Sequence, residues 1–439
     1  IYTTTMHYWY IALVSSLLLL TVGSVFVGPS LLAVSYQSGS SSSAATAEIL
    51  AVEQTTKPVP DTRAAVQHVP LPESLKAIYM SACVAGTPSF RNELLALTKR
   101  TEINAIVIDI KDYSGTISFP PTNAAWRPAW EAANCGARDM KDFLATLHAA
   151  NIYMIGRITV FQDPFEAARS PHLAVKRSDG ITTWKDGKGL SFIDVAAKEH
   201  WNHIIELSVD AYNIGFDERD FDYVRYPSDG NMADISFPHT TGSDWPHDKQ
   251  ANLEAFFRYL NSELDKPERF AAVRHENTGR ASSTPYTSAD LFGMTTTNYD
   301  DLSIGQVQER AAPYFDAVAP MVYPSHYPKS FLGLGNPNDY PYKVVYHAMK
   351  SGVDRMLAST TPMQGFLHTR LGTSTPAVYQ KPVYDGNRLR TWIQDFDYGG
   401  DYDAADVRAQ IQASYDAGVD SWMIWAPSNR YTEAALKAE

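Results

Sequence analysis

The sequence predicts an α/β fold, a (β/α)8 TIM barrel, on three observations. From Lys76 onward, eight short apolar segments alternate with longer amphipathic segments. The apolar segments are nearly continuous, which is typical of parallel strands that helices cover on both faces. No glycine-rich phosphate loop follows any of them, which argues against the open nucleotide-binding sheets. Eight such units spread over most of a 439-residue chain suit a closed barrel better than an open sheet.

Each strand is expected where an apolar or β-branched run occurs, and each helix where apolar residues recur with a helical period. In chain order, the expected strands are 77–81 (AIYMS), 105–110 (AIVIDI), 152–160 (IYMIGRITV), 216–224 (FDERDFDYV), 288–294 (SADLFGM), 317–323 (AVAPMVY), 356–361 (MLASTT) and 421–426 (SWMIWA). The expected helices are 90–100, 139–150, 196–211, 250–264, 304–315, 342–351 and 403–417.

The composition limits the partners and the chemistry. The formal net charge is −12, and such an acidic surface disfavours sequence-independent binding to nucleic acid. The two cysteines, Cys83 and Cys135, are too few for a disulfide-built scaffold or a four-cysteine zinc site. No cluster of His, Cys and Asp has convincing metal-ligand spacing, so neither a metal nor another cofactor is expected. The aromatic content of 12% suits either a carbohydrate-contacting surface or simply an aromatic core.

The first 74 residues differ from the rest of the chain. Residues 1–34 contain an uncharged apolar run, Tyr8–Val27, of the length that spans a bilayer, so we expect a signal anchor or a signal peptide. An uncleaved anchor is favoured because the run is longer than an ordinary signal-peptide core. Residues 35–74 are rich in Ser, Ala, Thr and Pro and are expected to form a flexible linker to a barrel at 75–439. The expected location is the cell membrane, as a single-pass protein with an extracytoplasmic barrel, or outside the cell if the signal is cleaved.

Charged and aromatic side chains recur at the carboxyl ends of the expected strands, the face where TIM barrels hold their functional residues. Asp222 and Asp290 stand out as candidate catalytic acids. Asp222 lies between two aromatic residues in a strand expected to be buried, where an ionised carboxylate is costly unless it is paired or functional. The candidates for binding substrate, each of which could instead be purely structural, are Asp112, Arg157, Asp163, Arg225, Tyr323, His326, Gln364, Trp425 and Asn429.

A pair of carboxylates on neighbouring strand ends is what glycoside hydrolysis requires. One carboxylic acid protonates the leaving oxygen, and the other carboxylate attacks the anomeric carbon or activates water. The two groups are about 5–5.5 Å apart in retaining enzymes and about 6.5–9.5 Å apart in inverting enzymes. Arg157 and Arg225 would orient Asp222 in such a site. The stereochemical outcome stays open at this point because it depends on the separation.

Five motifs, in order along the chain, carry a resemblance to a known family. They are Ile108–Asp112 (IDIKD), Gly156–Ile158 (GRI), Phe221–Pro227 (FDYVRYP), Ser288–Gly293 (SADLFG) and Pro320–Tyr327 (PMVYPSHY). Between about Leu75 and Asn429 the chain resembles a glycoside-hydrolase-like family of bacterial TIM barrels, long classed as a domain of unknown function. That family is distantly similar to the α-amylase-like barrels. The resemblance implies that Asp222, on the fourth strand, is the nucleophile and that Asp290, on the fifth strand, is the acid/base.

The chain departs from the α-amylase pattern in two places. Asp290 stands where that pattern has Glu, and the shorter side chain reaches less far. Asp112, Asp163 and Glu218 are therefore reserve candidates for the acid. The last block also differs, because Ala426–Asn429 (APSN) replaces a more usual Trp-Asn-Ala-like ending.

The sequence favours a membrane-tethered glycoside hydrolase that acts on cell-envelope or extracellular polysaccharide by a two-carboxylate mechanism. The alternative is a non-catalytic glycan-binding barrel tethered to the membrane, since a glycan-binding cleft also uses Asp, Arg and Trp. A hydrolase of another bond is a third reading, although no Gly-x-Ser-x-Gly or His-Glu-x-x-His motif occurs. Cys83 and Cys135 are expected on the same face of the barrel, where either a disulfide or two free thiols fits the sequence.

Overall fold

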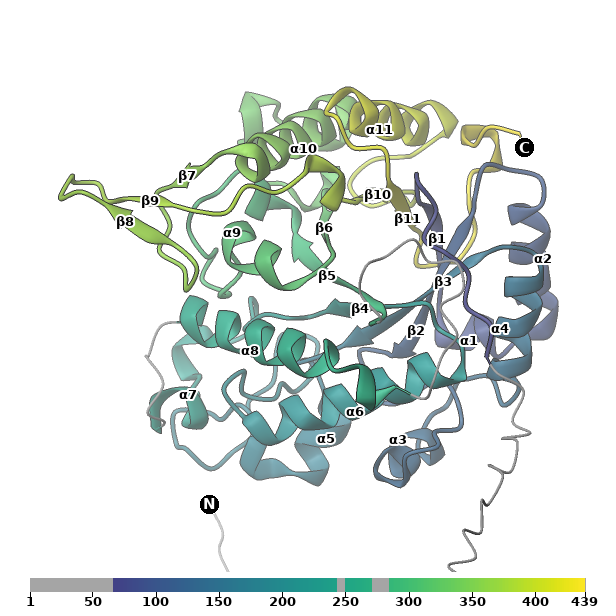
Figure 1. Cartoon of the computed structure of the whole chain (residues 1–439), viewed down its shortest axis with the longest axis horizontal. Helices are drawn as coiled ribbons and strands as arrows, with labels where there is room; N and C mark the ends of the chain where they lie inside the picture. The colour runs from purple at the N-terminus through teal and green to yellow at the C-terminus, as the bar shows by residue number, and fades with distance from the viewer. Residues whose placement is uncertain (1–65, 243–248, 271–283, 439) are drawn as a thin grey trace, which may run out of the picture. The chain divides into compact units, whose positions relative to one another are not determined.

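The computed structural model describes residues 66–242, 249–270 and 284–438, and eight strands form the centre of this part (Figure 1). They are β1 (Lys76–Met80), β2 (Ala105–Lys111), β3 (Tyr153–Thr159), β4 (Glu218–Asp222), β5 (Tyr286–Phe292), β6 (Ala317–Met321), β10 (Thr391–Gln394) and β11 (Trp422–Trp425). The strands are parallel and pair in this order, and β11 pairs with β1 to close the barrel. The closed barrel expected from the sequence is confirmed.

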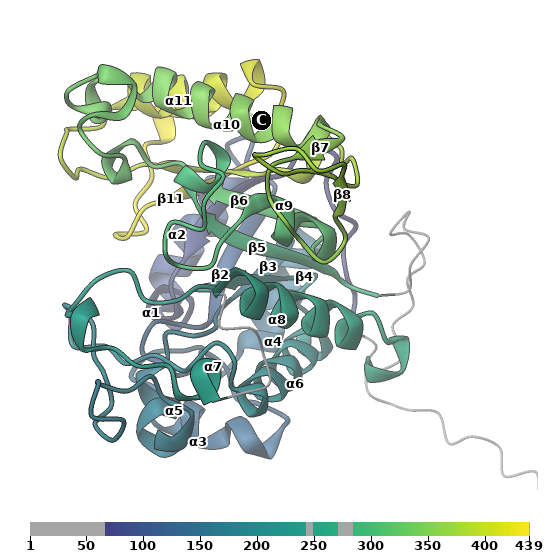
Figure 2. The ribbon, with the colours of Figure 1, turned by 90° about the vertical axis from the view of Figure 1, so that its left-hand side faces the viewer.

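The helices surround the barrel (Figures 1 and 2). They are α1 (Ala82–Ala85), α2 (Pro88–Thr98), α3 (Arg127–Glu131), α4 (Met140–Ala149), α5 (Pro164–Arg169), α6 (Lys198–Ile214), α7 (Pro238–Gly242), α8 (Lys249–Leu264), α9 (Gln308–Ala311), α10 (Pro341–Leu357) and α11 (Ala404–Asp416). Helices α10 and α11 lie side by side in both views.

Alternation along the strands separates the barrel interior from the layer beneath the helices. In β2, Ile106, Ile108 and Ile110 join the apolar core between strands and helices. Ala105 and Val107, which alternate with these isoleucines, belong to a separate cluster inside the barrel. Successive side chains of a strand point to opposite faces, so a polar residue in phase with the inner set must lie inside the barrel.

The expected seventh strand at 356–361 is wrong. Met356 and Leu357 end helix α10, and Thr360–Thr361 forms β7, which belongs to a separate antiparallel sheet with β8 (Thr369–Leu371) and β9 (Val378–Gln380). This small sheet projects at the left of Figure 1. The seventh barrel strand is β10, which pairs with β6 and β11. Because β10 has only four residues and follows a long polar insertion, its apolar signal is weak.

The expected helix at 304–315 is also much shorter than the pattern suggests. Helix α9 covers only Gln308–Ala311 and continues as a 3-10 turn through Tyr314. Pro313 has no N–H to donate, and its ring conflicts with the preceding helical turn. The apolar period of this segment therefore reflects burial in a short connection and not a long helix.

The N-terminal expectations fall mainly outside the described residues. The apolar run at Tyr8–Val27 and the linker up to residue 65 lie there. The described chain begins at Val66, and Val69 and Leu71 pack against the apolar cluster inside the barrel. Among residues 66–242, 249–270 and 284–438, no helix is both long and apolar enough to cross a bilayer.

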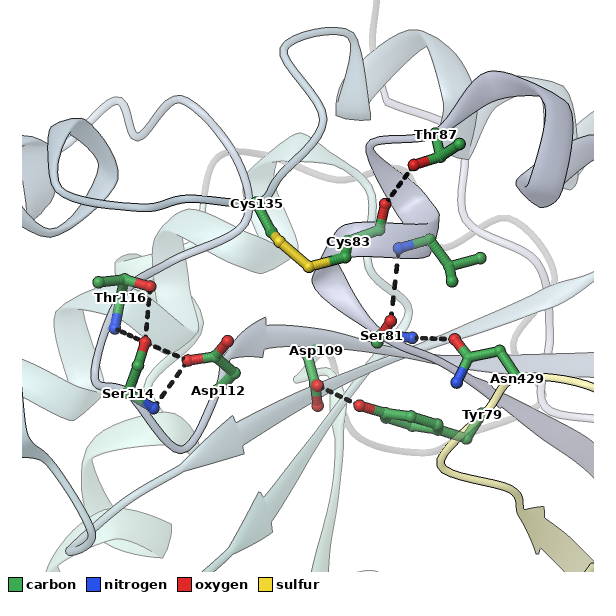
Figure 3. The surroundings of a disulfide bond; sticks show 11 residues. Tyr79, Ser81, Cys83, Thr87, Asp109, Asp112, Ser114, Thr116, Cys135 and Asn429 are labelled. Carbon is green, nitrogen blue, oxygen red and sulfur yellow. Dashed lines mark hydrogen bonds between the residues drawn. A yellow bond between two sulfur atoms is a disulfide. The ribbon is translucent and has the colours of Figure 1, made fainter. Parts of the chain in front are cut away.

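Cys83 and Cys135 form a disulfide, which settles the question that the sequence left open (Figure 3). Cys83 lies in α1 directly after β1, and Cys135 lies in the long connection after β2. The two Cα atoms are 4.5 Å apart across a sequence separation of 52 residues. The bridge thus ties together the loops that follow two adjacent barrel strands.

Replacing both cysteines with serine is expected to lower the melting temperature by several degrees. The cross-link removes chain entropy from the unfolded state, which for a loop of this length amounts to about 4 kcal/mol. Thermal unfolding of the full chain, followed by circular dichroism, measures the effect. Wild-type protein in excess reductant should melt together with the Cys83→Ser/Cys135→Ser variant. Equal melting temperatures with and without reductant would contradict the expectation.

Candidate active site

Strand β4 lines the barrel interior with acids. Glu218, Asp220 and Asp222 occupy alternate positions and face inward, whereas Phe221 packs in the core beneath the helices. The three acids and the intervening Arg219 are fully or almost fully buried. The acidic set therefore runs through the barrel, and its last member, Asp222, stands at the carboxyl end of the strand.

Glu218, a reserve candidate for the acid, lies at the opposite end of β4 from Asp222. Its Oε1 accepts hydrogen bonds from Arg390 at 2.5 Å and from Ser288 at 2.6 Å, and its Oε2 accepts one from Tyr153 at 3.0 Å. Both carboxylate oxygens are thus occupied inside the barrel. These contacts give Glu218 a structural role in joining β4 to the neighbouring strands.

Asp222 is held by a guanidinium and by the backbone. Its Oδ2 accepts from Arg157 Nε at 3.1 Å and also from Nη2 of the same side chain. Its Oδ1 accepts from the N–H of Tyr223 at 2.5 Å. Tyr223 has a left-handed backbone with φ of 51°, which ends the strand at Asp222 and is a conformation that costs free energy in a bulky residue. This turn directs the carboxylate and the Tyr223 ring to the same cavity.

Asp290, on β5, lies near the same arginine that binds Asp222. Asp290 Oδ2 lies 3.6 Å from Arg157 Nε, and Oδ1 accepts from Trp392 Nε1 at 2.5 Å. The structure therefore brings the two predicted catalytic acids together. Because their Oδ2 atoms lie 3.1 and 3.6 Å from one nitrogen, these oxygens can be no farther apart than the sum of those distances, 6.7 Å.

Asp290 and Asp220 behave as a pair of buried acids. Burial and the nearby charges of Asp220 and Asp222 raise the pKa of Asp290 well above its ordinary range. Burial also raises the pKa of Asp220, to about 6. Asp220 Oδ1 accepts from the Ser288 hydroxyl at 2.8 Å, and its Oδ2 is buried without a hydrogen-bond partner among the described residues. Burial and the neighbouring acids therefore favour the protonated form of Asp290.

Arg157 is itself positioned by a second acid. Its Nη1 donates to Asp109 Oδ1 at 2.7 Å, and Asp109 accepts a further hydrogen bond from the Tyr79 hydroxyl (Figure 3). Its guanidinium also lies over the Trp425 ring, 5.4 Å from the ring centre. Arg157 is thus fixed from several sides, which fixes the position of Asp222 in turn.

A cavity of about 320 Å3 opens at these strand ends. Among the predicted site residues, it is lined by Asp222, Asp290, Arg157, Arg225, Tyr323, His326 and Trp425. Further lining comes from Lys188, Tyr223, Phe292, Gly293, Met294, Met321, Tyr327 and Trp392. Gly293 has no tolerated substitute here, since a Cβ would lie 2.4 Å from the carbonyl oxygen of Met321. Acids on one wall and aromatic rings on the others suit a sugar, whose faces stack on rings and whose hydroxyls bind polar groups.

Two predicted binding residues instead support loops (Figure 3). Asp112 Oδ1 accepts from the backbone N–H of Ser114 at 2.8 Å and from its hydroxyl at 2.5 Å, which makes an Asx turn. Asn429 Oδ1 accepts from the N–H of Ser81 at 2.7 Å, so it joins the chain after β11 to the chain after β1. Neither side chain lines the cavity.

Asp163 and Gln364 also lie outside the cavity. Asp163 caps helix α5 by accepting from the N–H of Glu166 at 2.8 Å, and it pairs with the buried Lys111 at 2.9 Å. Gln364 was expected at the end of a barrel strand, but it is exposed and its backbone carbonyl accepts from Arg310. Gln364 was assigned to the site only because it follows the expected strand at 356–361. Since that segment is not a barrel strand, nothing places Gln364 at the site.

Sequence reasoning missed three residues that shape the site. Trp392 was overlooked because β10 was not recognised as a barrel strand. Lys188 comes from a loop with no strand-end signal. Asp109 lies in the second expected strand but was not assigned to the site, although its phase with Val107 in β2 places it inside the barrel.

A closed (β/α)8 barrel with a buried carboxyl pair in an aromatic cavity at the strand ends defines a glycoside-hydrolase-like barrel. The chain belongs to the family described as "Putative glycosyl hydrolase domain", whose model matches residues 77–431. This confirms the resemblance stated from the sequence motifs.

One solved structure supports this fold, and two others are similar at lower TM-scores. The glycoside hydrolase domain of PgaB (BpsB) from Bordetella bronchiseptica is 12% identical, with a TM-score of 0.52, and the match covers 83% of this chain and 99% of that one. A hypothetical protein from Ruminiclostridium thermocellum is 31% identical over 43% of this chain and 92% of its own, with a TM-score of 0.37. The spore cortex-lytic enzyme SleL from Bacillus megaterium is 12% identical, covering 83% and 74%, with a TM-score of 0.41. No curated protein matches the chain.

Proposed function

We propose that this protein is a retaining glycoside hydrolase of cell-envelope or extracellular polysaccharide. The observation that carries the proposal is the pair formed by Asp222 and Asp290 around Arg157, in a cavity of about 320 Å3 lined with aromatic rings. The family membership supports the class of reaction. The disulfide and the apolar N-terminal run support action outside the cytoplasm, with the chain either anchored in the membrane or secreted.

The two acids have different environments, which suit different roles. Asp290, whose pKa is raised by burial and by the neighbouring acids, donates its proton to the glycosidic oxygen as the bond to the anomeric carbon breaks. Asp222, oriented by Arg157, attacks the anomeric carbon and forms a glycosyl ester. Asp290, now a carboxylate, takes a proton from the water that hydrolyses this ester. Asp222 is thereby released and Asp290 is protonated again.

The separation of the acids supports retention of configuration. Their Oδ2 atoms lie at most 6.7 Å apart, the sum of the 3.1 and 3.6 Å distances to Arg157 Nε. Retaining enzymes have separations of about 5–5.5 Å, whereas inverting enzymes need about 6.5–9.5 Å to admit water between acid and sugar. The limit on the two Oδ2 atoms includes the retaining range and reaches only the lower edge of the inverting range.

The test is the configuration of the first product. The full chain is incubated with a panel of neutral and acidic polysaccharides, and release of reducing ends identifies the substrate. Proton NMR during the first minutes then reports the anomer formed. We expect the anomer of the cleaved bond; the opposite anomer would exclude Asp222 as nucleophile.

One observation favours a non-catalytic glycan-binding barrel as a second candidate. Asp290 is only 1% exposed, and its oxygens already contact Trp392 and Arg157. An acid with these contacts can stabilise the barrel without donating a proton to a substrate. Binding of a glycan without release of reducing ends, under conditions where the protein is folded, would decide for this candidate.

A further inference from the structure

One arginine of the cavity has a charge that the protein does not neutralise. Arg225 is 8% exposed and lines the cavity. Its Nη1 donates to the carbonyl of Tyr226 and to the hydroxyl of Ser228, each at 3.2 Å, and its guanidinium stacks on Tyr223 and Phe292. In the described part of the chain, no carboxylate pairs with it. A buried guanidinium without a carboxylate is costly, and an anionic ligand would remove that cost.

A second cation lines the same cavity. Lys188 lies on an exposed loop, and no carboxylate among the described residues pairs with its ammonium group. Lys188 and His326 both line the cavity, and the charge of Lys188 adds to burial in lowering the pKa of His326. Two cations from different loops therefore face one cavity.

The contrast with Arg157 shows that this is not a general property of the site. Arg157 is paired with two carboxylates, Asp109 and Asp222, so it leaves no unneutralised positive charge for a ligand. Burial and the neighbouring acids raise the pKa of Asp290, which favours its uncharged form in this cavity. The chain as a whole carries a net charge of −12, so two cations without carboxylate partners in one cavity run against the overall negative charge of the protein. Such a local excess selects ligands by charge.

We propose that the cavity recognises an acidic glycan, with Arg225 and Lys188 binding a carboxylate, phosphate or sulfate group of the sugar. Arg225 supplies the planar pair of N–H donors that suits an oxyanion, and Lys188 supplies a mobile charge at the rim. This inference rests on the glycan site of the proposed function and narrows its substrate to anionic sugars.

The test is glycan binding to the full chain carrying Asp222→Asn, which prevents turnover during titration. The acidic probes are polygalacturonate, alginate, hyaluronan, chondroitin sulfate and a teichoic acid. The neutral probes are carboxyl-reduced polygalacturonate, dextran, xylan and chitin oligosaccharides. We expect at least one acidic probe to bind more tightly than every neutral probe. The acidic probe that binds then distinguishes carboxylate from phosphate and sulfate.

The charge assignment is tested with added substitutions. Arg225→Gln should weaken binding of the acidic probe by about tenfold or more, because its anion then enters the cavity without its main partner. Lys188→Gln should weaken it less, because Lys188 is exposed and screened. Arg225→Lys keeps the charge and should restore part of the affinity. Lys185→Gln, on the same exposed loop but outside the cavity, is the matched control and should bind as the parent does.

Three results would overturn the inference. They are failure of all acidic probes to bind, neutral probes binding at least as tightly as acidic ones, and unchanged affinity in a folded Arg225→Gln variant. Failure of the hydrolase proposal has a different signature, since wild-type protein would then bind an acidic probe without releasing reducing ends. Conversely, hydrolysis of neutral glycans alone would keep the hydrolase and reject the acidic substrate.

Discussion

Asp222→Asn is expected to lower kcat by about a thousandfold or more, because the amide cannot attack the anomeric carbon. The fold should survive, since the Asn carbonyl still accepts from Arg157 and Arg157 keeps its contact with Asp109. The cost in the free energy of unfolding should be about 1–3 kcal/mol. Initial rates and circular dichroism of the same preparation measure the two effects separately.

A matched control and a rescue experiment make this result specific. Asp420→Asn changes an exposed acid just before β11, at the far end of the barrel strand from the cavity, and should leave the rate unchanged. In Asp222→Gly, added azide can enter the space of the carboxylate and attack the anomeric carbon. Recovery of turnover with a glycosyl azide product indicates a nucleophile, whereas a residue that only supports the fold is not replaced by azide. Full activity of Asp222→Asn would refute the assignment.

Asp290→Asn is expected to reduce activity by about 10²–10⁴-fold on natural glycans, since general acid assistance to the leaving oxygen is lost. Aryl glycosides with acidic phenol leaving groups need little protonation of the leaving oxygen. The variant should therefore lose much less activity on them than on natural glycans. The wild-type rate should fall as pH rises through the raised pKa of Asp290, because the acid is then ionised. This fall in rate at high pH should be absent from the Asp290→Asn variant. Equal losses on both kinds of substrate would argue against an acid role.

The same substitution should stabilise the protein at neutral pH. An unfolded Asp titrates near pH 3.9, whereas folded Asp290 keeps its proton to a much higher pH. Between these two pKa values the unfolded state binds fewer protons, so each pH unit lowers the free energy of unfolding by about 1.4 kcal/mol. Below about pH 4 the contribution is absent. The Asn amide resembles the protonated acid and can donate to Asp220 without this dependence.

Melting curves of wild type and Asp290→Asn between about pH 4 and pH 8 test this sign. The advantage of the variant should grow as pH rises through the window set by the unfolded and folded pKa values. Asp420→Asn again serves as the control, since that side chain is exposed. A variant that is less stable than wild type at every pH would mean that the charge of Asp290 is needed for folding.

Most of the barrel could be predicted because its signals are local. β2 and β11 are continuous apolar runs, and the helices α6 and α8 repeat with a helical period. β10 failed because four residues within a long insertion carry too little pattern to distinguish a strand from a loop. The segment at 356–361, which lies before the insertion, was taken in its place, although it joins the end of helix α10 to β7.

The sequence by itself determined the barrel class, the family and the two acids at the ends of neighbouring strands, because strand phase and motif order are properties of the linear chain. Only the tertiary structure decided which strand-end side chains share a cavity. Asp112 and Asp163, like Asp222, lie near the carboxyl ends of expected strands, yet one closes a turn and the other caps a helix. The protonation of Asp290 and the unpaired charge of Arg225 also depend on neighbours from distant strands and loops. Electrostatic energy depends on distances through space, and closure of the barrel sets those distances.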